Sequence, residues 1–311
     1  MMSSAPAPPF AHTINVRQNQ PIFLEMLHAA DTAHVYAQRW ETARAIVALA
    51  SSCGALVAAF WHTAAKPMSI MGGLGTAALL AMTFLSQART KEATKIQERF
   101  DYELFGLPAT DEFKPFPTDE ELGALAQKCK RDKRDWYVDV AGLPQAYAIL
   151  LCQRQNLQWD WPLRRQWASL LLKVAVTWLV AGLTIALVMD WTTRELLLRW
   201  LIPSLPGLAL ATNLVVKNRQ VAREKQQLAL QVDERLSVLP AITVVGAVSE
   251  EIHAELLAYC RVLQDRIYRQ RNHAERVPGF LYRRSKTKNE NLAQTAASRL
   301  KERLLGHVPE A

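Results

Sequence analysis

Four apolar blocks alternate with charged segments along the chain. The third block, SLLLKVAVTWLVAGLTIALVM, ends at Met189 and holds a single charged residue, Lys173. An α-helix rises about 1.5 Å per residue, so roughly 20 apolar residues cross a hydrocarbon core about 30 Å thick. The other three blocks are comparable in length and composition. The pattern therefore predicts four transmembrane helices, over residues 45–61, 68–88, 169–189 and 196–216.

Short polar turns, HTAAKP and DWTTRE, join the blocks within each pair. The fold class that we expect is an all-α integral membrane protein, with four transmembrane helices in two antiparallel hairpins and a helical cytosolic layer. The expected parts are a disordered N-terminus (1–13), a cytosolic helix (14–44), the first hairpin (45–88), a cytosolic helical insert (89–168), the second hairpin (169–216) and a cytosolic C-terminal helical region (217–311).

The polar segments show helical periodicity. We expect helices over 14–44, 91–105, 119–131, 217–236 and 249–273, the first packing on the cytosolic part or docking on the membrane surface. Thr118 and Glu121 have the spacing of a capping box, which marks a helix start. The run LPAITVVGAV after Val238 fits either a short strand or a buried connector, and periodicity does not separate the two.

Small residues and prolines mark the spans that pack or bend. Small side chains let membrane helices approach closely, and proline removes a backbone hydrogen bond and kinks a helix. The second span could therefore pack against a neighbour or line a pore, and the fourth could carry a simple packing kink or a partly hydrated hinge. The candidate residues, with two threonines of the third span, are Gly72, Gly73, Gly75, Thr76, Thr177, Thr184, Pro203, Pro206 and Asn213.

Lysine and arginine gather at one end of the four blocks. The two short turns hold only Lys66 and Arg194, whereas twelve basic residues flank the opposite ends, including Arg164, Arg165 and Lys217. Because basic residues favour the cytosolic side, both termini and the 89–168 insert are expected in the cytosol. The net charge of +8 and the pI near 9.4 then indicate a membrane surface as the partner, not a nucleic-acid polymer.

Tryptophans and charged residues meet where the insert joins the third span. Trp159, Trp161 and Trp167 suit the membrane–water boundary, since the indole ring is apolar and its N–H is polar. The polar residues there are either an internal ion-pair and capping network or a latch that senses a signal and moves the third span. The candidate latch residues are Trp136, Arg154, Asn156, Trp159, Asp160, Arg164 and Arg165.

Catalytic signatures are missing from the sequence. It contains no phosphate-binding glycine loop, no GxSxG and no HExxH, so we expect no enzyme activity and no cofactor. Glu250, Glu251, His253 and Glu255 do not share one helix face, which argues against a metal site. The four cysteines have no pairing pattern, and Cys152 is best interpreted as a structural thiol although Arg154 is near it in sequence.

Three segments together resemble a known family. They are RQNQPIFLEML near the start, FDYELFGLP from Phe100, and RDWYVDVAGLP leading to CQRQNLQWDWPLRRQWA; PGFLYRR after the last amphipathic helix also fits. Their order around two membrane hairpins resembles the SMODS-associated four-transmembrane family, pore-forming effectors of bacterial nucleotide-signalled conflict systems. The chain departs from the family pattern at LPAT after Phe105, where an aromatic residue and Asn are expected; this touches only the connector.

The resemblance implies an effector that permeabilises the inner membrane on activation. It also implies a homo-oligomer in the lipid bilayer and a nucleotide second messenger, or a nucleotide-sensing partner protein, as the trigger. Two other functions stay open at this point. One is a regulated ion channel or transporter with a housekeeping role, and the other is a membrane scaffold for a sensor partner.

Overall fold

The computed structural model describes residues 10–109, 115–239, 250–274 and 277–306, and in these ranges every regular element is helical. The run expected as a strand or connector after Val238 lies almost wholly outside the described residues. The elements are α1 (Phe10–Arg17), α2 (Pro21–Phe60), η1 (His62–Ala64), α3 (Ala65–Phe105), α4 (Asp119–Ala126), α5 (Gln145–Gln158), α6 (Trp161–Val188), α7 (Thr193–Leu196), η3 (Leu197–Leu201), α8 (Ile202–Val238), α9 (Glu250–His273) and α10 (Gly279–Leu304).

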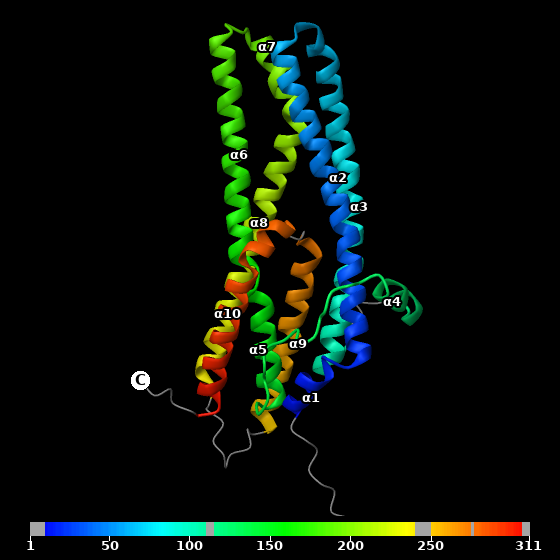
Figure 1. The fold of residues 1–311 in the computed structure, drawn as a ribbon. Helices are drawn as coiled ribbons and strands as arrows, with labels where there is room; N and C mark the ends of the chain where they lie inside the picture. Colours follow the sequence, from blue (N-terminus) through cyan, green and yellow to red (C-terminus); the bar gives the residue numbers. More distant parts are fainter. Residues whose placement is uncertain (1–9, 110–114, 240–249, 275–276, 307–311) are drawn as a thin grey trace, which may run out of the picture.

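Long helices give the molecule its shape. α2 and α3 have 40 and 41 residues, so each is roughly 60 Å long, about twice the thickness of the bilayer core. Four helical stretches, Pro21–Phe60, Ala65–Phe105, Gln145–Val188 and Thr193–Val238, are long and apolar enough to cross a membrane. The expected all-α fold with four spans is therefore confirmed. Figure 1 shows the two hairpin turns and α7 together at one end of the molecule, and α1, α4, α5, α9 and α10 toward the other.

The half that carries the hairpin turns has apolar side chains on its outside. Phe84 is 73% exposed and Leu187 is 74% exposed, and most of the other large exposed apolar residues between 46 and 85 and between 170 and 216 also lie on the spans. In water this surface would be unstable, whereas in a bilayer it faces lipid. We call this half the membrane half.

The opposite half has an ordinary buried core. Side chains from α2, α3, α5, α8 and α9 form it, with Phe100, Tyr147 and Ile149 fully buried at its centre. The same long helices thus contribute to both halves. α2, α3 and α8 run from one half into the other as continuous helices.

The helix boundaries differ from the expected ones at three places. α1 already begins at Phe10, and the chain turns at Gln18–Gln20 before α2 starts at Pro21, in the first helical turn, where proline costs no helical hydrogen bond. The helix expected over 91–105 is the end of α3, and the one expected over 119–131 stops at Ala126. The Thr118–Glu121 capping box is confirmed, with both of its hydrogen bonds formed.

α8 is the element that joins the two hairpins. It packs on α6 along the second hairpin and also on α2 and α3, while α6 packs mainly on α8. In the membrane half, α6 consequently stands at the outside of the bundle (Figure 1).

Candidate functional site

The segments that carry the family resemblance meet at one buried tyrosine, Tyr137. The amide of Tyr137 donates to Gln18 Oε1 at 2.8 Å, and its hydroxyl donates to Asp101 Oδ1 at 2.6 Å. Asn156 Nδ2 donates to the same hydroxyl oxygen at 2.7 Å. Four residues far apart in sequence are therefore linked around a ring that is 3% exposed. We call Gln18, Asp101, Tyr137 and Asn156 the motif junction.

Charged groups from α3 and α9 extend this junction. Arg271 is 2.5 Å from Asp101 Oδ2 and 3.7 Å from Glu98 Oε2, and Gln264 Nε2 donates to Glu98 Oε2 at 2.8 Å. Gln153 Nε2 in turn donates to Gln264 Oε1 at 3.0 Å. Both carboxylates are fully buried, so their charges depend on these partners.

Burial shifts the acidity of these groups. Burial is the main cause that raises the pKa of Glu98 to about 8, and the neighbouring charge of Asp101 adds to it, against the opposing effect of Arg271. Burial and the Asp101 charge also raise the pKa of Tyr137 well above its usual value. Glu98 is thus the group in this cluster that exchanges a proton near neutral pH.

A second polar cluster lies where the insert joins the third span. Asp160, just before α6, accepts from Arg164 Nε at 2.7 Å and pairs with Lys225 of α8. Arg164 NH1 also donates to Asn218 Oδ1 on α8 at 3.2 Å. We call Asp160, Arg164, Asn218 and Lys225 the boundary cluster; it ties the start of α6 to α8 at the membrane edge.

The electrostatics of the boundary cluster favour the ionised pair. Burial alone would raise the pKa of Asp160, but the charges of Arg164 and Lys225 hold it well below its usual value. Burial lowers the pKa of Lys225, and the charge of Asp160 opposes that shift. Removing the carboxylate would leave two buried cations facing each other.

The other expected latch residues lie elsewhere. Arg154 pairs with Asp233 of α8, in the half that holds the buried core, and Gln155 beside it donates to the Trp136 carbonyl at 3.3 Å. Arg165 is exposed, with its guanidinium 5.9 Å from the Trp161 ring centre. Trp159 is half-buried. Asp160 and Arg164 thus belong to the boundary cluster and Asn156 to the motif junction, while the other four lie outside both, and the latch role of the seven residues stays a prediction.

In the membrane half, two of the small residues sit at helix contacts. A Cβ added to Gly72 would lie 2.6 Å from Ile202 O, so α3 and α8 cross there with backbones touching. One added to Gly75 would lie 3.2 Å from the Pro206 ring. Gly182 of α6 gives similar room to the Trp200 ring, which stacks on Trp178 at 4.8 Å.

The fourth span contains an irregular turn where it packs against α3. The amide of Ile202 donates to Leu197 O, five residues back, in a π-helical turn, and Pro203 has no N–H. Leu198 O therefore lacks its usual helical donors, and Ser69 Oγ of α3 lies 2.6 Å from it. Pro203 and Pro206 are both buried. Within the single chain, the prolines thus take part in helix packing.

The remaining expected pore residues do not converge. Nothing lies within 4 Å of a Cβ at Gly73, and Thr76 bonds only to Gly72 O of its own helix. Thr177 and Thr184 are exposed on α6, about one and three turns beyond Lys173 on the same side. Asn213 is half-buried on α8. Their role as pore lining stays a prediction.

Cysteine and metal chemistry receive no support from the described residues. Burial raises the pKa of the Cys152 thiol well above its usual value and raises the pKa of Cys260 to about 12, so both are unreactive at neutral pH. Glu250, Glu251 and Glu255 are exposed, and Glu255 pairs with Arg235. Among the described residues, no three His, Cys, Asp or Glu side chains are grouped to hold a metal ion.

A family model now decides the assignment. The model described as the SMODS-associating 4TM effector domain matches residues 12–300. The chain belongs to this family. The match covers all four spans, the motif junction and the boundary cluster, so the resemblance drawn from the sequence segments is confirmed.

One curated relative is similar over part of its length. The protein described as "Probable CBASS effector molecule", from Bacillus cereus (strain VD146), is 24% identical over 145 residues, which are 44% of this chain and 48% of the relative. The match thus spans about half the length of that relative. No solved structure matches the chain.

Sequence reasoning missed the acidic part of the junction. Glu98, Asp101 and Gln264 were not singled out, although Asp101 and Tyr137 both belong to the segments that carry the resemblance. One signal was present: Glu98 and Asp101 are three residues apart, on a helix face shared with Phe105. Carboxylates on an apolar face indicate a buried polar contact.

Proposed function

We propose that this chain is an effector of a nucleotide-signalled anti-phage system that permeabilises the bacterial inner membrane, without catalysing a reaction. The family assignment and the relative's description support the effector role. The permeabilising step rests on one observation: the helices that span the membrane also form the cytosolic core. A signal received by the core therefore acts directly on the spans.

The boundary cluster is the proposed restraint. Asp160 forms ion pairs with both Arg164 on α6 and Lys225 on α8, and so holds the start of α6 against α8. Because α6 packs mainly on α8, losing this contact frees the outermost span of the bundle. The motif junction acts upstream, since Asn156 and Asp160 lie on consecutive turns of the chain leading into α6.

Several copies are needed for a pore. Four helices with so few intramembrane charges do not enclose a wide aqueous channel alone. The exposed face of α6 that carries Lys173, Thr177 and Thr184 is the most polar lipid-facing stripe of the second hairpin. In a homo-oligomer, released α6 helices would turn this face to the pore. The distribution of lysine and arginine supports an orientation with both termini in the cytosol.

The trigger is a nucleotide second messenger, or a partner protein that senses one. Family membership supports a nucleotide-signalled context. The cytosolic half would receive that signal, because it holds the buried ionisable groups whose partners could be exchanged.

Asp160→Asn tests the proposal without knowledge of the trigger. The change removes the carboxylate charge that Arg164 and Lys225 both contact, so it should loosen α6 from α8 and open the membrane constitutively. Expression from a tight inducible promoter in a bacterial host should collapse the membrane potential within minutes, as read by a voltage-sensitive dye, while the wild-type chain leaves it intact.

Asp190→Asn is the matched control. It makes the same chemical change on the exposed turn after α6, at the other end of the helix. It should behave as wild type. A D160N protein that is present in the membrane at wild-type level and leaves the potential unchanged would contradict the proposal.

A further inference from the structure

The four spans meet at one short segment of the fourth, residues 198–206. We call the ends of the spans at the hairpin turns their outer ends, and the ends toward the buried core their inner ends. The segment follows α7 almost directly, so it lies toward the outer ends. Ser51 Oγ of α2 donates to the Pro203 carbonyl at 2.6 Å. Ser69 Oγ of α3 donates to the Leu198 carbonyl at 2.6 Å. Both helices of the first hairpin are therefore bonded to the backbone of the fourth span.

α6 joins the same segment through two tryptophans. Trp178 Nε1 donates to Ser204 Oγ at 2.9 Å, and its ring stacks on the Trp200 ring with the centroids 4.8 Å apart. A Cβ on Gly182 would lie 2.1 Å from Trp200 Nε1, so the Trp200 ring packs directly on the backbone of α6. This contact depends on the missing side chain at position 182. We call the meeting of the four spans over residues 198–206 the outer joint.

Between the outer joint and the inner ends, α6 and α8 are loosely packed. The side chains of residues 169–181 on α6 are exposed or half-buried, and so are those of residues 207–214 on α8. The buried side chains of α6 lie on either side of this stretch; they are Leu163, Arg164, Ala168, Gly182 and Ala186. Two contact regions, roughly 20 Å apart along the helix, thus hold α6 on α8. One is the outer joint, and the other contains the boundary cluster.

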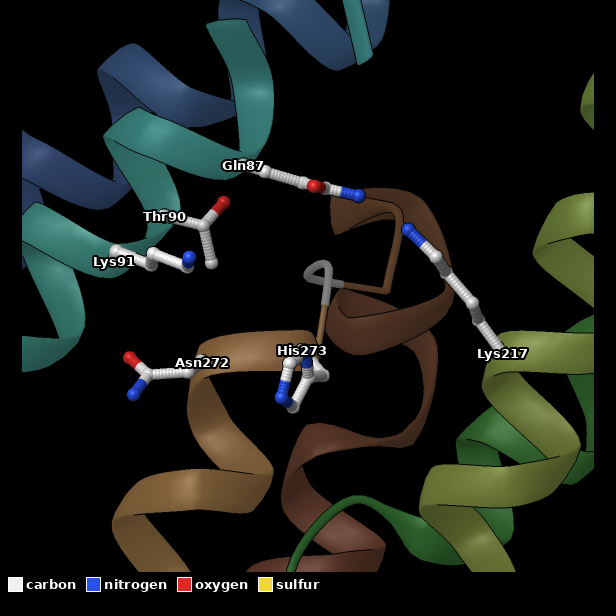
Figure 2. A pocket seen from close by; sticks show the side chains of 6 residues that line it. All are labelled: Gln87, Thr90, Lys91, Lys217, Asn272 and His273. Carbon is white, nitrogen blue, oxygen red and sulfur yellow. The ribbon is translucent and has the colours of Figure 1, made fainter. Parts of the chain in front are cut away.

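α3 shows the same difference between its outer and inner contacts with α8. At the outer joint, a Cβ on Gly72 would lie 2.6 Å from the Ile202 carbonyl oxygen, so the two backbones touch. At the inner ends, a cavity of about 90 Å³ lies between the two helices. Figure 2 shows Gln87 and Thr90 of α3 on one side of this space and Lys217 of α8 on the other. The spans are therefore tightly packed at the outer joint and further apart at their inner ends.

The hairpin turn beyond the joint is fixed by hydrogen bonds of its own. Trp191 N donates to the Ala186 carbonyl at 2.8 Å, and Asp190, with a left-handed φ of 53°, ends α6. The Thr192–Glu195 capping box then starts α7, with both of its hydrogen bonds formed. Backbone groups thus hold α6 at its outer end, whereas the boundary cluster holds its inner end through side chains.

We propose that the outer joint stays closed while the inner ends of the spans separate, so that α6 turns about the joint when the boundary cluster is lost. From Gly182 to Arg164 the helix is about 27 Å long, so a turn of about 10° moves its inner end by roughly 5 Å. The resulting gap is widest toward the buried core and closes at the joint. This movement rests on the proposed function for the event that starts it, but distances within the chain measure it without membrane leakage.

The test is pulsed electron paramagnetic resonance on the full chain in liposomes, with nitroxide labels on pairs of introduced cysteines. Labels at Gln166 and Arg219 report the inner ends of α6 and α8, and labels at Leu183 and Leu205 report the outer joint. All four positions are exposed. Dilution with unlabelled chain restricts the distances to those within one molecule.

The native cysteines need only two substitutions for this labelling. Cys53 is exposed and Cys129 is half-buried, so both are replaced by serine, whereas Cys152 and Cys260 are buried.

Asp160→Asn separates the two ends. It should lengthen the 166–219 distance by roughly 5 Å and leave the 183–205 distance within about 1 Å of wild type, as expected for a turn about a fixed joint. Asp190→Asn, the matched control, should leave both distances as in wild type. A 183–205 distance that lengthens together with the 166–219 distance, or a 166–219 distance that D160N leaves unchanged, overturns the proposal.

Gly182→Leu tests the joint itself while the boundary cluster is intact. Even the new Cβ needs about 3.5 Å from the Trp200 ring and has 2.1 Å, so the 183–205 distance should lengthen by roughly 2 Å or more. The 166–219 distance should not change. Gly73→Leu is the control, because nothing lies within 4 Å of a Cβ there. A 183–205 distance that stays as in wild type in G182L also overturns the proposal.

Dye release recorded on the same liposomes separates this movement from permeabilisation. Sealed D160N liposomes with a longer 166–219 distance alone would contradict the proposed function and support the outer joint. Leaking D160N liposomes in which both distances lengthen would support the proposed function and overturn the outer joint.

Discussion

Gly72 and Gly73 are neighbours in the sequence with opposite surroundings. A Cβ at position 72 would meet Ile202 O at 2.6 Å and Pro203 Cα at 2.7 Å, both backbone atoms, whereas nothing lies within 4 Å at position 73. Gly72→Ala should destabilise the chain by about 1–3 kcal/mol through overpacking. Gly73→Ala should be neutral or stabilise by up to about 1 kcal/mol, since alanine favours a helix. Thermal unfolding in detergent, followed by tryptophan fluorescence, compares the two; equal effects would contradict the α3–α8 crossing.

Glu98 makes a residue-scale prediction about pH. Its pKa is about 8 in the folded chain and 4.5 for the ordinary side chain, so the folded state binds the extra proton between these values. The contribution of Glu98 to the free energy of unfolding is therefore fully present below about pH 4.5. It is lost as pH rises toward 8, by at most about 1.4 kcal/mol per pH unit.

Glu98→Gln removes this dependence. The gain in melting temperature of E98Q over wild type should be small at pH 5, grow up to about pH 8, and then level off. The charged groups that face the Glu98 carboxyl group are the same in wild type and in E98Q; they are Asp101, Arg261 and Arg271. A difference that does not vary with pH would show that Glu98 is ionised in the folded chain.

At the scale of the element, the fourth span depends on a hydroxyl from another helix. Ser69 Oγ lies 2.6 Å from Leu198 O, which the π-turn and Pro203 leave without a helical donor. Ser69→Ala should cost about 0.6–2 kcal/mol, the range for such bonds in membranes. Thr83→Ala is the control, because Thr83 bonds only to Leu79 O of its own helix. The measurement is the unfolding midpoint in detergent. An equal fall in both variants would show that the bond between Ser69 and the fourth span gives no extra stability.

The elements themselves were largely predictable. Apolar blocks and short turns indicated all four spans, and the Thr118–Glu121 spacing marked a helix start. The helix boundaries outside the membrane were not predictable. A helix can continue from the lipid-facing part into the core without any sequence signal at the change. α3 runs unbroken to Phe105 for this reason.

Side-chain contacts between residues far apart in the chain could not be predicted from the sequence. Asp160 and Arg164 are four residues apart, so their ion pair was within reach of spacing arguments. Lys225 and Asn218 come from α8, 54 to 65 residues away, and nothing local indicates them. The same holds for Tyr137, whose partners lie on three other segments.

At the scale of the whole molecule, the two halves share their helices. A bilayer about 30 Å thick holds only half of a 40-residue helix, and the other half contributes to the buried core. The boundary cluster lies at the point where the membrane half and the buried core meet. This arrangement is what links a cytosolic signal to the bilayer in the proposed function.

Dye release from liposomes tests that link most directly, because no host protein is present. Purified wild-type chain and the Asp160→Asn variant are reconstituted at equal density around a self-quenched fluorophore. The D160N liposomes should release their dye within minutes, while those with wild-type or Asp190→Asn protein stay sealed. Intact liposomes with correctly inserted D160N would contradict the claim that the boundary cluster restrains a membrane-permeabilising effector.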